Sequence, residues 1–224
     1  MPTTNQFVSN GIDIPFEFYA PVPATTTPGF VAIAYGTDGM SEPWGTQIRA
    51  YASALTHRGF AVMIPDYFAS TRTSPGPAAF EVIGGYRDIW QKALADSITY
   101  AKANLAIDPG RVGLLGFSLG GHLSMRQRSY AKVLVEYFAP ELDGFGDVTG
   151  TTSHSQIHHG MSDLIVPFSP NADDAKRLLT NEGAVVKVFS YAGAGHGFIG
   201  SDSSNTEARN NSSQRTLDCF TKFL

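Results

Sequence analysis

A short glycine-flanked motif contains the first residue that could do chemistry. Residues 116–120 read Gly-Phe-Ser-Leu-Gly and match the pattern G-x-S-x-G. Where this pattern is functional, the serine occupies a sharp strand-to-helix turn that holds its hydroxyl clear of the sheet. The match follows an apolar run at 112–115 and precedes a segment that suits a helix. We therefore interpret Ser118 as a candidate nucleophile; the alternative is an ordinary glycine-rich turn.

A serine hydroxyl is a weak nucleophile unless a base removes its proton. His196 is the best candidate base, because it lies between Gly195 and Gly197, just after the apolar run 185–191. Small neighbours let the chain bend and bring the imidazole toward Ser118. The other five histidines lack this position after a late strand: His57, His122, His154, His158 and His159.

A third group must fix the imidazole tautomer and stabilise its protonated form. Asp163 follows the apolar run 155–159 and is the preferred candidate. Glu136 is the alternative acid, because it interrupts another apolar run near its end, where an unpaired carboxylate would be costly. A metal centre at His154, His158, His159 and Asp163 is not expected, because neighbouring strand residues 158 and 159 point to opposite faces.

Hydrolysis through a serine also needs two N–H donors for the developing oxyanion. The backbone amide of Leu119 is one candidate, since it begins the helix after the serine. The amide of Thr37 is the other, because the loop 35–39 follows the first predicted core strand. The glycines at 36 and 39 could instead serve only to turn the chain.

These residues all follow strands of a predicted α/β fold. Continuous apolar runs indicate strands covered on both faces, and their alternation with helices predicts a mostly parallel central sheet with helices on both faces. The stretch 5–19 alternates and predicts an antiparallel edge pair, whereas the polar patches 70–77 and 201–213 are expected to be loops. Strands are predicted at 30–35, 60–64, 111–117, 132–138, 155–159 and 185–191, and helices at 46–57, 89–101, after 118, 169–181 and 213–223.

The composition limits the class of protein further. The chain has 224 residues, a net charge of −4 and 16% charged residues, which fits one domain over 1–224 and no nucleic-acid partner. Its single cysteine, Cys219, excludes an internal disulfide. No apolar stretch predicts a membrane span and no signal peptide is visible, so we expect a cytoplasmic protein without a membrane partner, although a processed secreted form stays open.

Four segments together resemble the dienelactone hydrolase family of α/β-hydrolases. They are residues 108–121 around the serine, Ile64-Pro65-Asp66-Tyr67-Phe68, residues 159–167 and residues 191–198. The resemblance runs from about residue 30 to the end. It implies the α/β-hydrolase fold, in which the chain order is nucleophile, acid and base, as for Ser118, Asp163 and His196. No large lid domain is expected, because the only insertion near the site, 140–152, is short.

Two departures from that family bear on the substrate. The family's typical members use a cysteine nucleophile paired with a glutamate on the first oxyanion loop, where this chain has Ser118 and Gly36. They also carry an arginine for the substrate carboxylate four residues after the histidine, where this chain has Gly200. Both differences favour a serine carboxylesterase on the same scaffold.

The sequence therefore predicts a serine hydrolase that cleaves small carboxylic esters through an acyl-enzyme, without a cofactor or a metal. Because the only insertion near the site, 140–152, is short, short acyl groups or small alcohols are expected. A lactonase or peptidase with the same three residues is the alternative, followed by a non-catalytic binding relative. Four aromatic residues are candidates for substrate contact: Trp44, Tyr67, Phe68 and Tyr137.

Overall fold

The computed structural model describes residues 2–150 and 152–224, and it confirms the predicted sheet. Eight strands form one sheet in the order β1-β2-β4-β3-β5-β6-β7-β8. Neighbouring strands pair in parallel along the part β4-β3-β5-β6-β7-β8, while β1 and β2 add the predicted antiparallel edge. The strands are β1 (Thr3–Ser9), β2 (Ile12–Tyr19), β3 (Phe30–Ala34), β4 (Ala61–Pro65), β5 (Val112–Phe117), β6 (Val133–Tyr137), β7 (His154–Gly160) and β8 (Val185–Tyr191).

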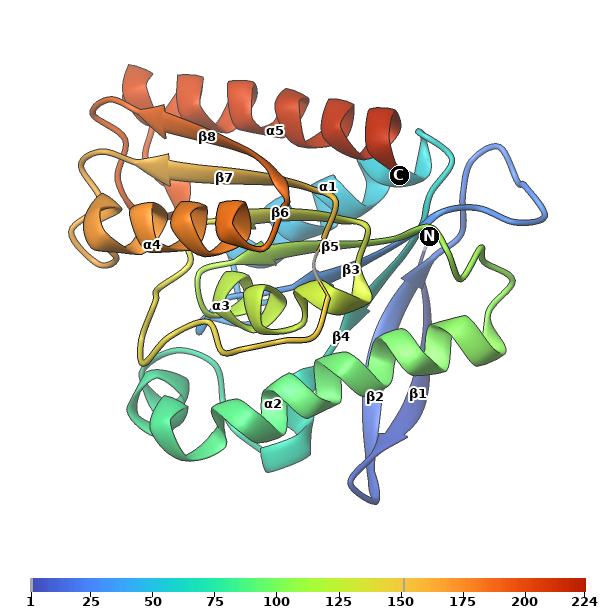
Figure 1. Ribbon diagram of the computed structural model, residues 1–224. Coiled ribbons are helices and arrows are strands. Elements are labelled where there is room, and N and C mark those ends of the chain that lie inside the picture. The colour runs from blue at the N-terminus through green and yellow to red at the C-terminus, as the bar shows by residue number, and fades with distance from the viewer. Residues whose placement is uncertain (1, 151) are drawn as a thin grey trace.

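Helices cover both faces of this sheet (Figure 1). Helices α1 and α5 pack together on one face, and α2, α3 and α4 lie on the other. The helices are α1 (Trp44–Thr56), α2 (Pro77–Asn104), α3 (Leu119–Arg126), α4 (Phe168–Asn181) and α5 (Ser203–Phe223), with short 3-10 turns at Tyr67–Thr71, Arg128–Tyr130 and His196–Phe198. No separate lid domain covers the sheet in the described part of the chain.

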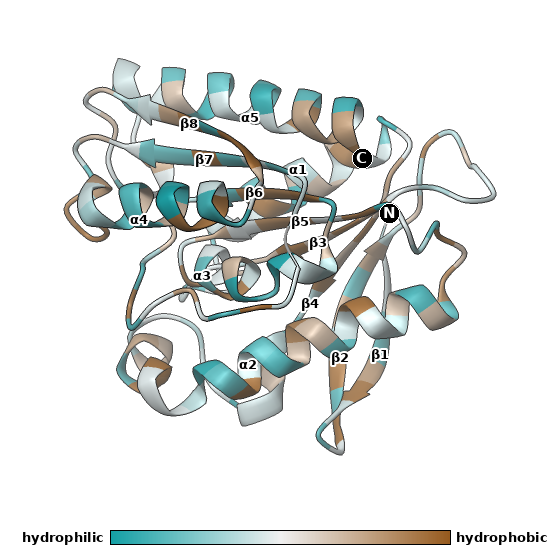
Figure 2. Cartoon of the chain, viewed as in Figure 1, coloured by the Kyte–Doolittle hydropathy of each residue, from teal (hydrophilic) through white to brown (hydrophobic). Residues whose placement is uncertain are grey.

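The central strands are apolar because both of their faces are covered. Every residue of β3, β4 and β6 is buried, whereas in β8, at the sheet edge, every residue except Tyr191 is exposed or half-buried. Figure 2 shows the hydrophobic colour concentrated on these middle strands. This rigid centre fixes the carboxyl ends of β3, β5, β6, β7 and β8, where ligand sites of such sheets lie.

One predicted loop is instead the first half of a helix. The polar segment 201–213 was expected to be irregular, but α5 already begins at Ser203. The Asp202 side chain caps it by accepting a hydrogen bond from the Asn205 amide at 2.9 Å. The face toward the sheet carries small or polar buried residues, such as Ala208 and Ser212, so an apolar stripe is missing there. None of the helices formed by the described residues has the length and hydropathy of a membrane span.

Candidate active site

Ser118 lies on the sharp turn between β5 and α3 that its motif predicts. Its backbone is in an unusual conformation, with φ 52° and ψ −119°, which costs on the order of 1–3 kcal/mol for a residue other than glycine. The flanking glycines are required by close packing. A Cβ atom on Gly116 would lie 2.4 Å from the Gly120 carbonyl oxygen, and one on Gly120 would lie 2.1 Å from the Ala34 carbonyl oxygen. The motif therefore serves to hold the serine at this turn.

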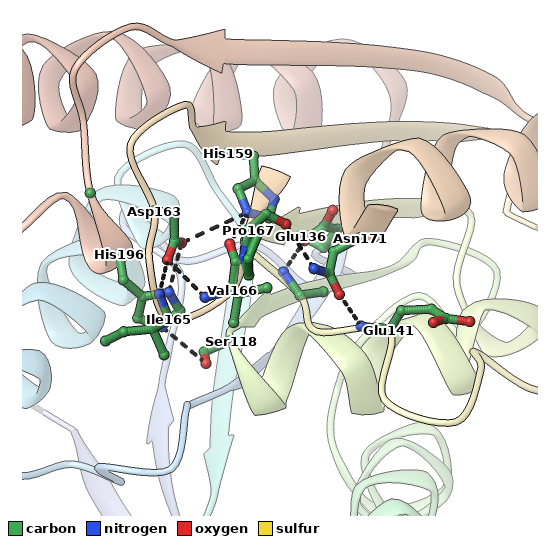
Figure 3. A network of polar contacts seen from close by, with 12 residues as sticks. Ser118, Glu136, Glu141, His159, Asp163, Ile165, Val166, Pro167, Asn171 and His196 are labelled. Atoms are coloured by element: carbon green, nitrogen blue, oxygen red, sulfur yellow. Dashed lines mark hydrogen bonds and ion pairs between the residues drawn. The ribbon is translucent and has the colours of Figure 1, made fainter. Parts of the chain in front are cut away.

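A continuous hydrogen-bond chain leads from Ser118 to an acid (Figure 3). Nε2 of His196 is 3.2 Å from Oγ of Ser118, and Nδ1 of His196 is 2.8 Å from Oδ2 of Asp163. Because an ionised carboxylate can only accept, Nδ1 carries the proton and Nε2 is free to accept one from the serine. The structure thus brings together the three residues that the sequence singled out.

The loop after β7 holds Asp163 in its ionised form. Its other oxygen, Oδ1, accepts hydrogen bonds from the backbone amides of Ile165 at 2.9 Å and Val166 at 2.8 Å. Burial alone would raise the pKa of Asp163, but the hydrogen bond and charge of His196, together with these amides, lower it below its ordinary value. The carboxylate can therefore stabilise a positive charge on His196.

His159 binds the loop after β7 through a hydrogen bond, a role that the sequence did not reveal. Its ring is fully buried, and Nε2 lies 2.8 Å from the Val166 carbonyl oxygen and 3.7 Å from Oδ2 of Asp163. Burial lowers its pKa, so the ring is neutral and donates to the carbonyl.

The other two histidines of the candidate metal cluster have aromatic neighbours. His158 stacks between Tyr137 and Phe189, and His154 stacks on Phe223. In the described part of the chain, no three potential ligands converge.

The alternative acid, Glu136, is not brought to His196. It is fully buried, and its Oε2 accepts a hydrogen bond from the Ala139 amide at 2.9 Å. Burial raises its pKa to about 8. A carboxyl group that is neutral near pH 7 cannot do the work of an imidazole-orienting carboxylate, so the assignment of that role to Asp163 is favoured.

The two candidate oxyanion donors lie beside Ser118. Thr37, in the loop after β3, and Leu119, at the first position of α3, both line the same cavity as Ser118 and His196. Neither backbone amide donates to another group among the residues that the structure describes. Gly36 lets the loop approach: a Cβ atom there would lie 3.2 Å from Cβ of Ser118, tighter than ordinary contact.

A cavity of about 300 Å³ opens next to the serine. Of the four aromatic candidates, Trp44 and Tyr137 line it. The prediction for Tyr67 and Phe68 is corrected, because both are buried in the core and neither lines the cavity. Tyr67 stacks on Tyr35 with ring centroids 4.3 Å apart, and Phe68 packs on Trp90 at 4.7 Å. Their position after β4 indicated the right edge of the sheet, but the 3-10 turn Tyr67–Thr71 directs both rings into the core.

Sequence reasoning missed several aromatic residues of the site. The ring of Phe138 lies 4.6 Å from the His196 ring and 5.4 Å from Phe198, and both phenylalanines line the cavity. Trp44 lies so close to Gly197 that a Cβ atom there would be 2.0 Å from the indole. Single aromatic residues in apolar segments give no signal that separates a cavity wall from ordinary core.

The fold and this arrangement define a hydrolase of the α/β-hydrolase class. Over residues 29–224 the chain matches the dienelactone hydrolase family, and it belongs to that family. A carboxymethylenebutenolidase of Pseudomonas putida is 29% identical over 181 residues, which span 70% of this chain and 71% of that protein. The quorum-quenching protein AidA of Acinetobacter baumannii (strain MDR-ZJ06) is 28% identical over 120 residues, 54% of this chain but only 37% of that protein's length.

Solved structures show the same fold at low sequence identity. A dienelactone hydrolase-like promiscuous phosphotriesterase from metagenomic libraries superposes with a TM-score of 0.80 at 15% identity, covering 100% of this chain and 98% of that one. A thermophilic esterase from Thermogutta terrifontis, with propionate bound, superposes with a TM-score of 0.70 at 15% identity, covering 97% and 94%. At this identity the likeness supports the fold alone.

Proposed function

We propose that this chain hydrolyses carboxylic esters through a covalent acyl-enzyme on Ser118. The observation that carries the proposal is the hydrogen-bond chain from Ser118 through His196 to the ionised Asp163. As Oγ of the serine bonds to the ester carbonyl carbon, its proton passes to Nε2 of His196. The same proton then goes to the leaving alkoxide when the ester C–O bond breaks, and a water molecule repeats the sequence to release the acid.

The charges that develop along this path have partners at the site. Asp163 faces the positive charge that forms on His196. The amides of Thr37 and Leu119 would donate to the oxyanion, and a donor of this kind is worth about 3 kcal/mol of transition-state stabilisation. These steps use only groups of the protein and a water molecule, so the proposed reaction needs no cofactor.

Cyclic esters and amides are the alternatives for the same three residues. A lactone is opened by the same acyl transfer, and one relative that aligns with 70% of this chain carries the name carboxymethylenebutenolidase. An amide differs only in its poorer leaving group. A panel of open esters, lactones and aminoacyl amides therefore ranks these substrate classes.

The test of the proposal compares two serine variants. Ser118→Ala should lower kcat on an activated ester at least about 10³-fold, and it should abolish covalent labelling by a fluorophosphonate probe. Ser53→Ala, an exposed serine on α1, is the matched control and should keep both activity and labelling. Full activity of Ser118→Ala would refute the proposed nucleophile, and a wild-type chain that neither labels nor turns over would favour a binding protein.

A further inference from the structure

The cavity beside Ser118 has a buried floor and an exposed rim, both apolar. Ile48, Tyr137 and Phe198 on the floor are almost fully buried. The rim consists of Phe80, Leu142 and Ile165, whose exposed fractions are 67%, 43% and 70%. We call these three residues the apolar rim. They come from three separate segments, namely the start of α2 and the loops after β6 and β7, and they converge on the mouth of one cavity.

The charged side chains of this cavity include one of each sign. Apart from His196, the charged residues among the described lining are Asp38 and Arg209. The Arg209 guanidinium donates to the carbonyl oxygens of Phe198 and Gly200 and, at 3.1 Å, to the Thr206 hydroxyl. These bonds fix the guanidinium but leave its charge in place, and the Asp38 carboxylate in the same lining carries the opposite charge, so the two together give an anionic substrate no net attraction.

Single exposed apolar side chains are common and need no explanation. A group of three at the entrance to a cavity that contains a strained serine is different, because a bound molecule would remove all three from water together. The area that such a molecule covers would be apolar on the rim and apolar again on the floor.

On the basis of the ester hydrolysis proposed above, we infer that the substrates are neutral esters with two apolar arms. One arm occupies the floor at Ile48, Tyr137 and Phe198, and the bulkier one, of aryl size, lies across the apolar rim. This differs from the sequence-based expectation of small groups, which followed from the shortness of segment 140–152. The cavity volume of about 300 Å³ is at the lower end of sites for drug-sized ligands.

The test uses two matched series of esters. In one, butyrate is esterified with methanol, benzyl alcohol or 4-carboxybenzyl alcohol; in the other, methanol is esterified with acetic or 3-phenylpropionic acid. Covering a phenyl group should raise kcat/KM about 10-fold or more in at least one series. The 4-carboxybenzyl ester should lose that gain, because the apolar rim would remove its carboxylate from water without offering it a hydrogen-bond donor.

Variants locate the effect on the rim. Phe80→Ser and Ile165→Ser should each lower the ratio of kcat/KM for the bulky ester to that for the small ester. Val185→Ser, an equally exposed apolar residue at the start of β8, should leave the ratio unchanged. If small esters are cleaved with dependence on Ser118 but bulk brings no gain, or the carboxylated ester is preferred, this inference alone is refuted. If no ester is cleaved, the proposed function fails with it.

An independent observation concerns the buried Glu136. Its Oε2 accepts the Ala139 amide, which closes a turn in which Phe138 has φ 41°. The Phe138 amide in turn donates to the His158 carbonyl oxygen at 2.9 Å, and the Phe138 ring contacts His196. We propose that Glu136 is a positioning residue, which acts through this strained turn to keep the Phe138 ring against the base.

Two variants of Glu136 test this role. Glu136→Gln keeps the size and the acceptor oxygen, and it should retain most of the activity. Glu136→Val removes the acceptor, and it should lower kcat about 10-fold or more. Neither KM nor the midpoint of thermal unfolding at pH 8 should fall in this variant. Equal activity of the two variants, or a loss of activity that only follows a loss of folded protein, would overturn the proposal.

Discussion

Replacing Glu136 with Gln should stabilise the protein by an amount that grows with pH. The carboxyl group is fully buried in β6, where one oxygen receives the Ala139 amide and the other meets no partner among the described residues. Burial raises its pKa from 4.5 to about 8. The unfolded chain, in contrast, exposes the carboxyl to water, where it ionises near its ordinary pKa.

The magnitude follows from the difference in bound protons. Below about pH 4.5 both states carry the proton and the pKa shift has no effect on stability. Between that pH and about pH 8 only the folded state keeps the proton, so the free energy of unfolding falls by about 1.4 kcal/mol per pH unit. Over the whole interval the loss is on the order of 5 kcal/mol, and above about pH 8 it stays constant. Glutamine cannot ionise and does not incur this loss.

The assay is urea unfolding of both proteins at pH 5, 6, 7, 8 and 9, followed by tryptophan fluorescence. The difference in the free energy of unfolding between Glu136→Gln and the wild type should increase up to pH 8 and then level off. Glu81→Gln, an exposed glutamate on α2, serves as the control and should show no such trend. A Glu136→Gln difference that is constant from pH 5 to 8 would refute the view that the folded protein holds this carboxyl protonated.

Three further outcomes are expected. Asp163→Asn should lower kcat about 10⁴-fold in steady-state ester assays while circular dichroism stays unchanged, because an amide can favour the wrong imidazole tautomer. Gly197→Ala should lose both activity and thermal stability, because residue 197 has a φ of 68° and the added Cβ would meet Trp44. Gly84→Ala, on α2 where an added Cβ meets nothing within 4 Å, should instead raise the unfolding midpoint slightly. Prolonged treatment with a chelator should leave ester turnover unchanged, and a loss restored by zinc would contradict the mechanism.

The sheet and the three central residues of the site were predictable because their signals are local. Each buried strand is a short apolar run, and the residues of interest follow the runs directly. Ser118, Asp163 and His196 follow β5, β7 and β8, whose carboxyl ends lie on one edge of the sheet. Parallel pairing from β5 through β6 and β7 to β8 then brings the three loops together without any further information.

Contacts that depend on packing between distant segments were not predictable. Tyr67 and Phe68, like Trp44, are aromatic residues in a segment that follows a buried strand. Their rings nevertheless pack in the core, on Tyr35 and Trp90. The first half of α5 has no apolar stripe, because small polar side chains suffice where it meets the sheet. The turn at Phe138 depends on a hydrogen bond to Glu136, and no sequence pattern marks that pairing.

The strained residues of the site explain why a costly buried acid can be tolerated. Ser118, Phe138 and Phe198 have φ values of 52°, 41° and 53°, and all three line the cavity. Left-handed backbone costs roughly 1–2 kcal/mol for each such residue, so the surrounding structure must hold it in place. Arg209 bonds the Phe198 carbonyl oxygen, as Glu136 bonds the amide after Phe138. Glu136 therefore lowers the stability of the folded protein near neutral pH, but it also holds the Phe138 turn in place beside His196. Glu136→Gln should recover that stability and keep the turn.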